Sequence, residues 1–297
     1  MQPNNSEHLV YSLPSFKPKI ETMPIKPLVK FASKSFTLPD TCVTLRSALD
    51  DPRKDLSDIA KLISVDPSLS AKILKLANSA LFRFPSQIET VAKALNVIGG
   101  EAAYNISIAE TANIAFKTFN SSAIDFAEFW KKAVMCGIIA KAIAQQKQIR
   151  GSERFFVLGI LQGLSELIVA SKHIEAYTKF SNDLDDLAPL AKQTKHFGFT
   201  FPECSGFIIQ EWNLPQSLVL PLQALIHPPK GEMSLEESIL YFAISICNYE
   251  GKDTEIAKLP QINHQAIETV GLSEEDYDMI MNYSRLETSK IANLISS

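Results

Sequence analysis

Apolar residues recur at helical spacing along nearly the whole chain from Leu38 onward. In the segment LSDIAKLI, for example, Leu56, Ile59, Leu62 and Ile63 are three or four residues apart and fall on one face of a helix. Runs that alternate β-branched and polar residues are few, and the sequence has no Asn-Gly pair of the kind that closes a β-hairpin. The sequence therefore predicts an all-α protein.

Helix-capping residues predict where these helices begin. Asp66 followed by Pro67 opens one of them, because aspartate accepts hydrogen bonds from the free amides of a first turn and proline suits its first position. Ser86–Glu89 and Thr200–Glu203 match the Ser/Thr-x-x-Glu capping box. They predict helix starts at TVAKALNVI and CSGFIIQEW.

The pattern divides the chain into four regions. Residues 1–37 contain five prolines and no sustained periodicity, which predicts an extended arm, either laid on the body or mobile. Residues 38–118 are expected to form an N-terminal helical lobe and residues 119–232 a larger second lobe, because the small polar residues of AFKTFNSSAID interrupt the helical pattern between them. Residues 233–297 add C-terminal helices that we expect to pack on the second lobe.

Charge and cysteine content restrict the surroundings in which the chain acts. Lysine and arginine number 29 against 33 aspartates and glutamates, and the net charge of -4 argues against broad nucleic-acid or anionic-membrane binding. The four cysteines lack a C-x-x-C pair and have apolar neighbours, which indicates buried thiols in a reducing compartment. No secretory signal is visible, and prolines break the longest uncharged stretch, 212–229. We expect a cytoplasmic protein with no membrane association.

Several short motifs, taken in order, match those of a known family. They are Asp66-Pro67 and Leu76-Ala77-Asn78-Ser79 in ISVDPSLSAKILKLANSALF, Gly99 at the end of IETVAKALNVIG, Trp130 after Phe129, LGILQGLS, and Trp212 with Pro215 in EWNLP. Over roughly Phe36 to Pro229 the chain resembles the HDOD family, the HD-related output domain of bacterial signalling proteins. The resemblance implies a multi-helical fold related to HD-type metal phosphohydrolases, with residues 119–232 as the HD-like lobe. It also implies a regulatory role in bacterial signal transduction.

The resemblance also locates the positions that hold metal in HD-type phosphohydrolases. The first histidine position falls at Lys132, the His-Asp pair falls at Gln162-Gly163, and the later histidine region retains His227. An ammonium does not ligate, glutamine offers a neutral carbonyl oxygen and glycine has no side chain, whereas a hydrolytic metal site needs several imidazoles and carboxylates. These degenerate positions predict a catalytically inactive domain, not an enzyme, with no metal and no cofactor. A more neutral vestigial cleft is expected there, as a candidate site for a small ligand.

Other motif residues have two interpretations each. Asn78 and Ser79 either bond backbone groups where the signature helix ends or line a partner surface, and the first interpretation is favoured. Trp130 and Trp212 lie among apolar residues, as expected of core anchors. The acidic loop NDLDDL lacks the glycine and terminal glutamate of an EF-hand and is expected to be a solvated loop.

Three functions follow from these observations. The leading hypothesis is a non-catalytic regulatory module that binds a signalling protein partner or a small ligand. The first alternative is a metal-dependent phosphohydrolase with altered ligands, using His227 and acids of the second lobe. The second alternative is nucleotide or nucleic-acid binding through a candidate basic patch of Lys72, Lys75 and Arg83, which the overall charge does not favour.

Overall fold

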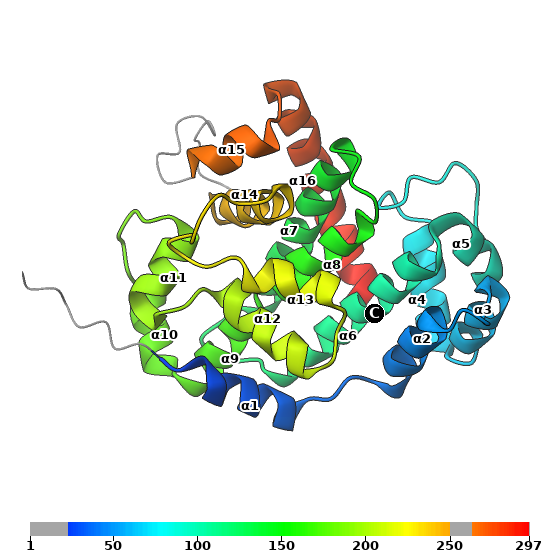
Figure 1. The fold of residues 1–297 in the computed structure, drawn as a ribbon, viewed down its shortest axis with the longest axis horizontal. Coiled ribbons are helices and arrows are strands. Elements are labelled where there is room, and N and C mark those ends of the chain that lie inside the picture. Colours follow the sequence, from blue (N-terminus) through cyan, green and yellow to red (C-terminus); the bar gives the residue numbers. More distant parts are fainter. Residues whose placement is uncertain (1–22, 250–262, 297) are drawn as a thin grey trace, which may run out of the picture.

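The computed structural model describes residues 23–249 and 263–296. It is 72% helical and contains no strand in these residues, so the all-α prediction is confirmed. Figure 1 shows α2 to α5 gathered at the right of the molecule, and α9 to α13 at the left and centre.

The helices fall into three groups along the chain. The first group is α1 (Ile25–Ser35), α2 (Asp40–Asp50), α3 (Leu56–Ser64), α4 (Pro67–Ala77), α5 (Val91–Ile98) and α6 (Gly100–Thr118). The second is α7 (Phe126–Gln146), α8 (Glu153–Leu161), α9 (Leu164–Lys172), α10 (Ile174–Ser181), α11 (Pro189–Phe197), α12 (Phe201–Glu211) and α13 (Gln216–Gln223). The third is α14 (Leu235–Tyr249), α15 (His264–Val270) and α16 (Glu274–Ser296).

The prediction of an extended arm over residues 1–37 is wrong for its last third. Residues 25–35 form α1, which buries Leu28 and Ala32 and packs against α12 and α9. Pro24 and Pro27 suggested extended chain, yet they lie at the N-cap and in the first turn of α1, where the missing amide of a proline has no helical partner to lose. Residues 1–22 lie outside the described residues.

Helix starts agree with two of the predicted caps and differ at the third. The Asp66 carboxylate accepts from the backbone N–H of Leu69 at 3.0 Å, and the Thr200 hydroxyl accepts from that of Glu203 at 3.2 Å. The predicted Ser86–Glu89 box is wrong, because α5 begins at Val91 and Thr90 is its cap. Residues 86–89 instead belong to a loop whose buried residue, Ile88, is bonded to the preceding helix.

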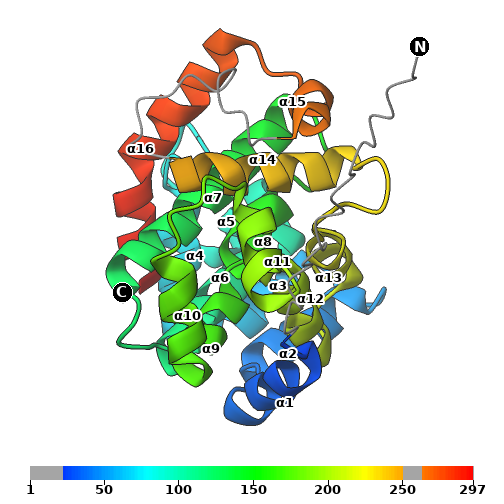
Figure 2. The ribbon, with the colours of Figure 1, turned by 90° about the vertical axis from the view of Figure 1, so that its left-hand side faces the viewer.

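The two central helices, α7 and α8, cross with their backbones in contact. A Cβ built on Gly159 would lie 2.4 Å from the backbone nitrogen of Gly137, and one on Gly137 would lie 2.4 Å from the carbonyl oxygen of Phe156. Around this crossing, α6 packs on α8, and α14 and α16 pack on α7 (Figure 2). Any larger side chain at these two glycines would separate the helices.

The boundary between the two lobes lies between α6 and α7. The break between α6 and α7 covers residues 119–125, within the polar segment that marked the boundary in the sequence. The helix α16 contacts α4 and α6 as well as α7, so the C-terminal part packs on both lobes and not on the second lobe alone.

The stretch Glu153–Lys172, which holds α8 and α9, is apolar enough in composition to cross a membrane, yet 78% of its most apolar window is buried in the fold.

The loop after the signature helix α4 is held by side chains from several directions. The Asn78 amide donates to the carbonyl oxygens of Leu74 and Ile88, and its own oxygen accepts from the Ile88 N–H, all at 2.8 Å. The Ser79 hydroxyl donates to the carbonyl of Leu76 at 2.7 Å. Both residues therefore bond backbone groups, as the first interpretation predicts.

Two helices of the rest of the fold bind the next residues of this loop. The Lys141 ammonium on α7 donates to the carbonyl of Leu81 at 2.6 Å, and the Tyr283 hydroxyl on α16 donates to that of Ala80 at 2.8 Å. Lys141 is only 2% exposed, and burial lowers its pKa to about 8. Two successive carbonyls thus connect the first lobe to α7 and α16.

The glycine crossing predicts a sharp difference between two Gly→Ala variants. Gly159→Ala should destabilise the fold by about 3 kcal/mol, because the added methyl group overlaps the α7 backbone. Gly231→Ala, where the added carbon meets nothing within 4 Å, should change stability by less than about 0.5 kcal/mol. Urea unfolding of both variants measures this, and equal stabilities would contradict the crossing.

We expect Asn78→Ala to lower the free energy of unfolding by about 1–3 kcal/mol. The reason is that the buried backbone N–H and C=O of Ile88 lose their hydrogen-bond partners. The matched control is Asn96→Ala on the exposed face of α5, where alanine should be neutral or slightly stabilising. Chemical denaturation distinguishes the two, and a loss no larger for Asn78 than for Asn96 would show that the loop does not need the amide.

Lys141 predicts a pH-dependent stability. The unfolded chain keeps the proton up to the ordinary pKa of 10.5, whereas the folded chain releases it near 8, so wild-type stability should rise with pH between these values. Compared with Lys141→Met, which lacks this group, the free energy of unfolding of the wild type should increase by up to about 3 kcal/mol over this range. Below about pH 8 the difference between the two proteins should not change with pH. Denaturation curves across this range measure it. Exposed Lys117→Met should show no such trend, and a pH-independent Lys141→Met difference would refute the prediction.

Candidate functional site

The first degenerate metal position, Lys132, lies on α7 and is turned toward α14. Its ammonium donates to the side-chain oxygen of Asn248 at 2.7 Å. A protonated amine has no lone pair for a metal, and this hydrogen bond engages the ammonium with α14. The position therefore supplies a positive charge of its own to this part of the fold.

The other two positions, Gln162 and Gly163, lie at the junction of α8 and α9. The backbone carbonyl of Gln162 accepts from the Ser205 hydroxyl at 3.0 Å. The ring of Phe129, on α7, covers Gly163, and a Cβ there would lie 3.0 Å from its Cζ atom. An aspartate at position 163 would displace this ring, so Phe129 occupies the space that an aspartate side chain would need.

A buried pair that we did not identify from the sequence lies beside these positions. Glu166, one helical turn after Gln162, accepts a hydrogen bond from the Tyr177 hydroxyl at 2.8 Å. Burial raises the pKa of Glu166, and the charge of Lys132 and the Tyr177 bond oppose that rise. A single acid in the apolar run LGILQGLSELIVA is the signal that could have pointed to it.

A cleft of about 580 Å³ opens at this place, between α7, α10 and α16. Phe129, Met135 and Tyr177 form apolar parts of its lining, while Lys131 and Lys132 contribute positive charge. Asp125, Glu128 and Arg285 also line it, so the expectation of a more neutral cavity is wrong. These charged side chains come from the start of α7 and from the middle of α16.

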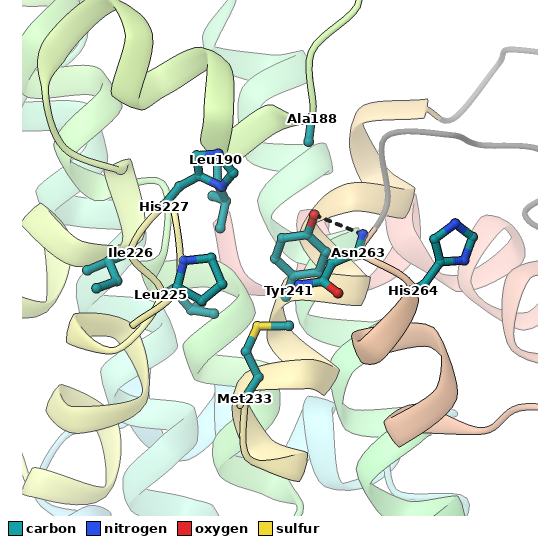
Figure 3. A pocket seen from close by; sticks show the side chains of 10 residues that line it. Ala188, Leu190, Leu225, Ile226, His227, Met233, Tyr241, Asn263 and His264 are labelled. Carbon is teal, nitrogen blue, oxygen red and sulfur yellow. Dashed lines mark hydrogen bonds between the residues drawn. The ribbon is translucent and has the colours of Figure 1, made fainter. Parts of the chain in front are cut away.

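The retained histidine, His227, lines a different pocket. This pocket has a volume of about 300 Å³ and shares no lining residue with the cleft of Lys132. Figure 3 shows His227 beside Leu190, with His264 beyond Tyr241 on the other side. Burial lowers the pKa of His227, which favours the neutral imidazole. Its lining contains two histidines and no carboxylate or thiol, so His227 lacks the partners of a metal site.

The candidate basic patch does not form a free cationic surface. The Lys72 ammonium lies 2.7 Å from the Glu110 carboxylate, with both side chains largely buried. The Arg83 guanidinium stacks over the Tyr283 ring at 4.5 Å, and only Lys75 points to an open groove. Because two of its three charges are engaged within the fold, the patch offers little for a phosphate backbone.

The remaining motif residues serve the core or a loop. Trp130 is 4% exposed and donates to the carbonyl of Ala292 at 3.1 Å, and buried Trp212 packs on Phe36 with ring centres 5.0 Å apart. In the acidic loop, Asp183 binds Lys195 at 2.7 Å and His196 at 2.5 Å. Across residues 23–249 and 263–296, no three His, Cys, Asp or Glu side chains gather as a metal site. The residues present do not fit a divalent metal.

Comparisons with solved structures agree on the fold. An HDOD domain protein of unknown function from Geobacter sulfurreducens is 18% identical, with a TM-score of 0.66 over 92% of this chain and 97% of that one. A protein from Shewanella amazonensis named as a candidate phosphohydrolase is 21% identical, with a TM-score of 0.67 over 91% and 98%. A candidate signal transduction protein from Marinobacter aquaeolei is 16% identical, with a TM-score of 0.65 over 92% and 66%. Because all three identities are below 25%, these similarities show a shared fold and nothing further.

Sequence comparison adds one curated relative and a family. The relative, an uncharacterized protein from Treponema pallidum (strain Nichols), is 24% identical over 233 residues, which are 75% of this chain and 44% of the relative. The chain thus spans less than half the length of the curated relative it matches. The HDOD domain family matches residues 36–228, nearly the range over which the motifs were found. The chain belongs to the HDOD domain family.

Proposed function

We propose that this protein is a non-catalytic regulatory module of bacterial signal transduction, which acts by binding a protein partner or a small ligand. The membership of the HDOD family and the fold shared with a candidate signal transduction protein support a signalling role. The chemistry of the former metal positions supports the absence of catalysis.

One observation carries the proposal. Where an HD-type enzyme holds metal, this chain has an ammonium bonded to Asn248 and a glycine covered by the Phe129 ring. Metal-assisted hydrolysis depends on a water whose pKa the metal lowers, and that metal needs deprotonated nitrogen and oxygen ligands. With Lys132 in place of the first ligand, metal binding would also oppose a fixed positive charge.

Two further features fit this proposal. The cleft beside Lys132 is large enough for a small organic molecule, with an apolar wall and charged groups at its rim. The four cysteines are unpaired and buried, which suits the reducing environment of the cytoplasm. The engaged charges of Lys72 and Arg83 leave little support for nucleic-acid binding, and nothing in this proposal involves a membrane.

The proposal predicts that the protein purified without chelator contains far less than one zinc, iron or manganese ion per chain. It also predicts no metal-dependent hydrolysis of bis(p-nitrophenyl) phosphate above the uncatalysed rate. Elemental analysis by mass spectrometry and a colorimetric assay with added Mn²⁺ measure both. The reason is that Lys132, Gln162 and Gly163 offer an ammonium, a neutral amide and no third side chain, which together cannot hold the ion.

An active HD-type phosphohydrolase, assayed under the same conditions, is the control for the method. Stoichiometric metal together with turnover that His227→Ala abolishes would overturn the proposal in favour of an enzyme with altered ligands. Turnover that does not follow the protein through a second purification step would point to a contaminating enzyme.

A further inference from the structure

A groove with two differently charged rims lies between α1 and α12. It has a volume of about 700 Å³, with Ile25 and Val29 of α1 and Phe207 of α12 on its apolar floor. Phe207 is 37% exposed, which is unusual for a phenylalanine in the middle of a packed helix. In Figure 1, α1 lies along the lower edge of the molecule, below α9 and α12.

The two helices that form the groove run in parallel. At one end the Met23 N–H donates to the carbonyl of Phe197 at 2.9 Å, just before α12 begins. At the other end the rings of Phe36 and Trp212, which follow the two helices, are 5.0 Å apart. Since α1 and α12 each have 11 residues, the groove is about 16 Å long, or three helical turns.

The α1 rim carries a row of three positive charges. Lys26, Lys30 and Lys34 are exposed and four residues apart, so they follow one side of the helix over about 12 Å. None of the ion pairs between described residues involves these lysines. The opposite rim bears Glu203 and Glu211 of α12, so the groove separates unlike charges across an apolar floor.

We propose that this groove binds an amphipathic helix of a partner protein whose acidic residues, spaced by four along one edge, face the three lysines of α1. This inference names the partner for the proposed regulatory role and rests on it. Carboxylates at i, i+4 and i+8 of a helix laid along α1 repeat about every 6 Å, the same interval as the lysines. An apolar stripe beside them would cover Ile25, Val29 and Phe207.

Backbone chemistry favours a helix over an extended peptide as the occupant. The groove walls are helices whose backbone amides and carbonyls are already paired, so a strand placed there would leave its own polar groups without partners. A helix satisfies its backbone internally and presents only side chains. The groove is therefore suited to the helix-in-groove mode of recognition.

The charges also favour a peptide over an anionic membrane surface. Of the apolar residues of α1, Leu28 and Ala32 are buried within the fold, and Ile25 and Val29 lie half-buried on the groove floor between the two charged rims. The α12 rim would place Glu203 and Glu211 against lipid phosphates, which costs free energy by like-charge repulsion. A partner helix accommodates both rims because its two edges can differ.

The test uses two fluorescent helical peptides of about 18 residues with one leucine stripe. One peptide carries glutamates along one edge, the other carries lysines there, and the second edge is glutamine in both. We expect the glutamate peptide to bind the full chain by fluorescence anisotropy and the lysine peptide to bind at least about tenfold more weakly. Charge reversal by Lys26→Glu, Lys30→Glu and Lys34→Glu together should invert this preference, since three exposed pairs of modest energy change from attraction to repulsion.

The matched control reverses three exposed lysines elsewhere, Lys54, Lys117 and Lys179, and thus changes the net charge equally. It should leave the preference unchanged, whereas Phe207→Glu should weaken both peptides. The inference is wrong if neither peptide binds saturably or if both triple variants behave alike. It is also wrong if vesicles containing phosphatidylserine bind the chain through the α1 lysines while the peptides do not. Those outcomes would leave the metal and hydrolysis results untouched, so the two proposals fail separately.

Discussion

The crossing of α7 and α8 at Gly137 and Gly159 is the contact on which the rest of the structure depends. Two glycines allow the backbones to meet, and this brings the helices closer than any other residue pair would permit. Lys132 lies five residues before one glycine, and Gln162 lies three residues after the other. The relative placement of Lys132 and Gln162 is therefore a consequence of this backbone packing.

Three contacts connect the helices around Lys132, Gln162 and Gly163. Phe129 of α7 packs on Gly163, Lys132 of α7 bonds Asn248 of α14, and Tyr177 of α10 bonds Glu166 of α9. These contacts are local and self-satisfied, so the interior needs no ion to balance its charges. The charged cleft beside Lys132 and the groove between α1 and α12 are the surfaces to which we assign the proposed binding roles.

Long-range hydrogen bonds connect the two lobes. The loop after α4 is fixed by Lys141 of α7 and Tyr283 of α16, and α16 also borders the cleft beside Lys132. The same two long helices therefore contact the signature loop and the cleft.

Errors in the sequence-based predictions have physical causes. Prolines 24 and 27 indicated extended chain because an isolated proline breaks a helix interior, but in a first turn they cost nothing. The Ser86–Glu89 box had the right residue types, yet the Asn78 side chain binds Ile88 and keeps this segment out of the helix. A neutral cleft was expected from Gln162 and Gly163 alone, whereas charged side chains from the start of α7 and the middle of α16 line it.

The sequence by itself determined the all-helical class, several helix starts and the family. Each of these depends on residue type and local spacing, which a single chain displays directly. Only the tertiary structure decided that Tyr177 binds Glu166, that His227 lies apart from Lys132, and that α1 and α12 form a groove. Helical periodicity identifies which face of a helix is buried, but it does not specify the distant segment against which that face packs.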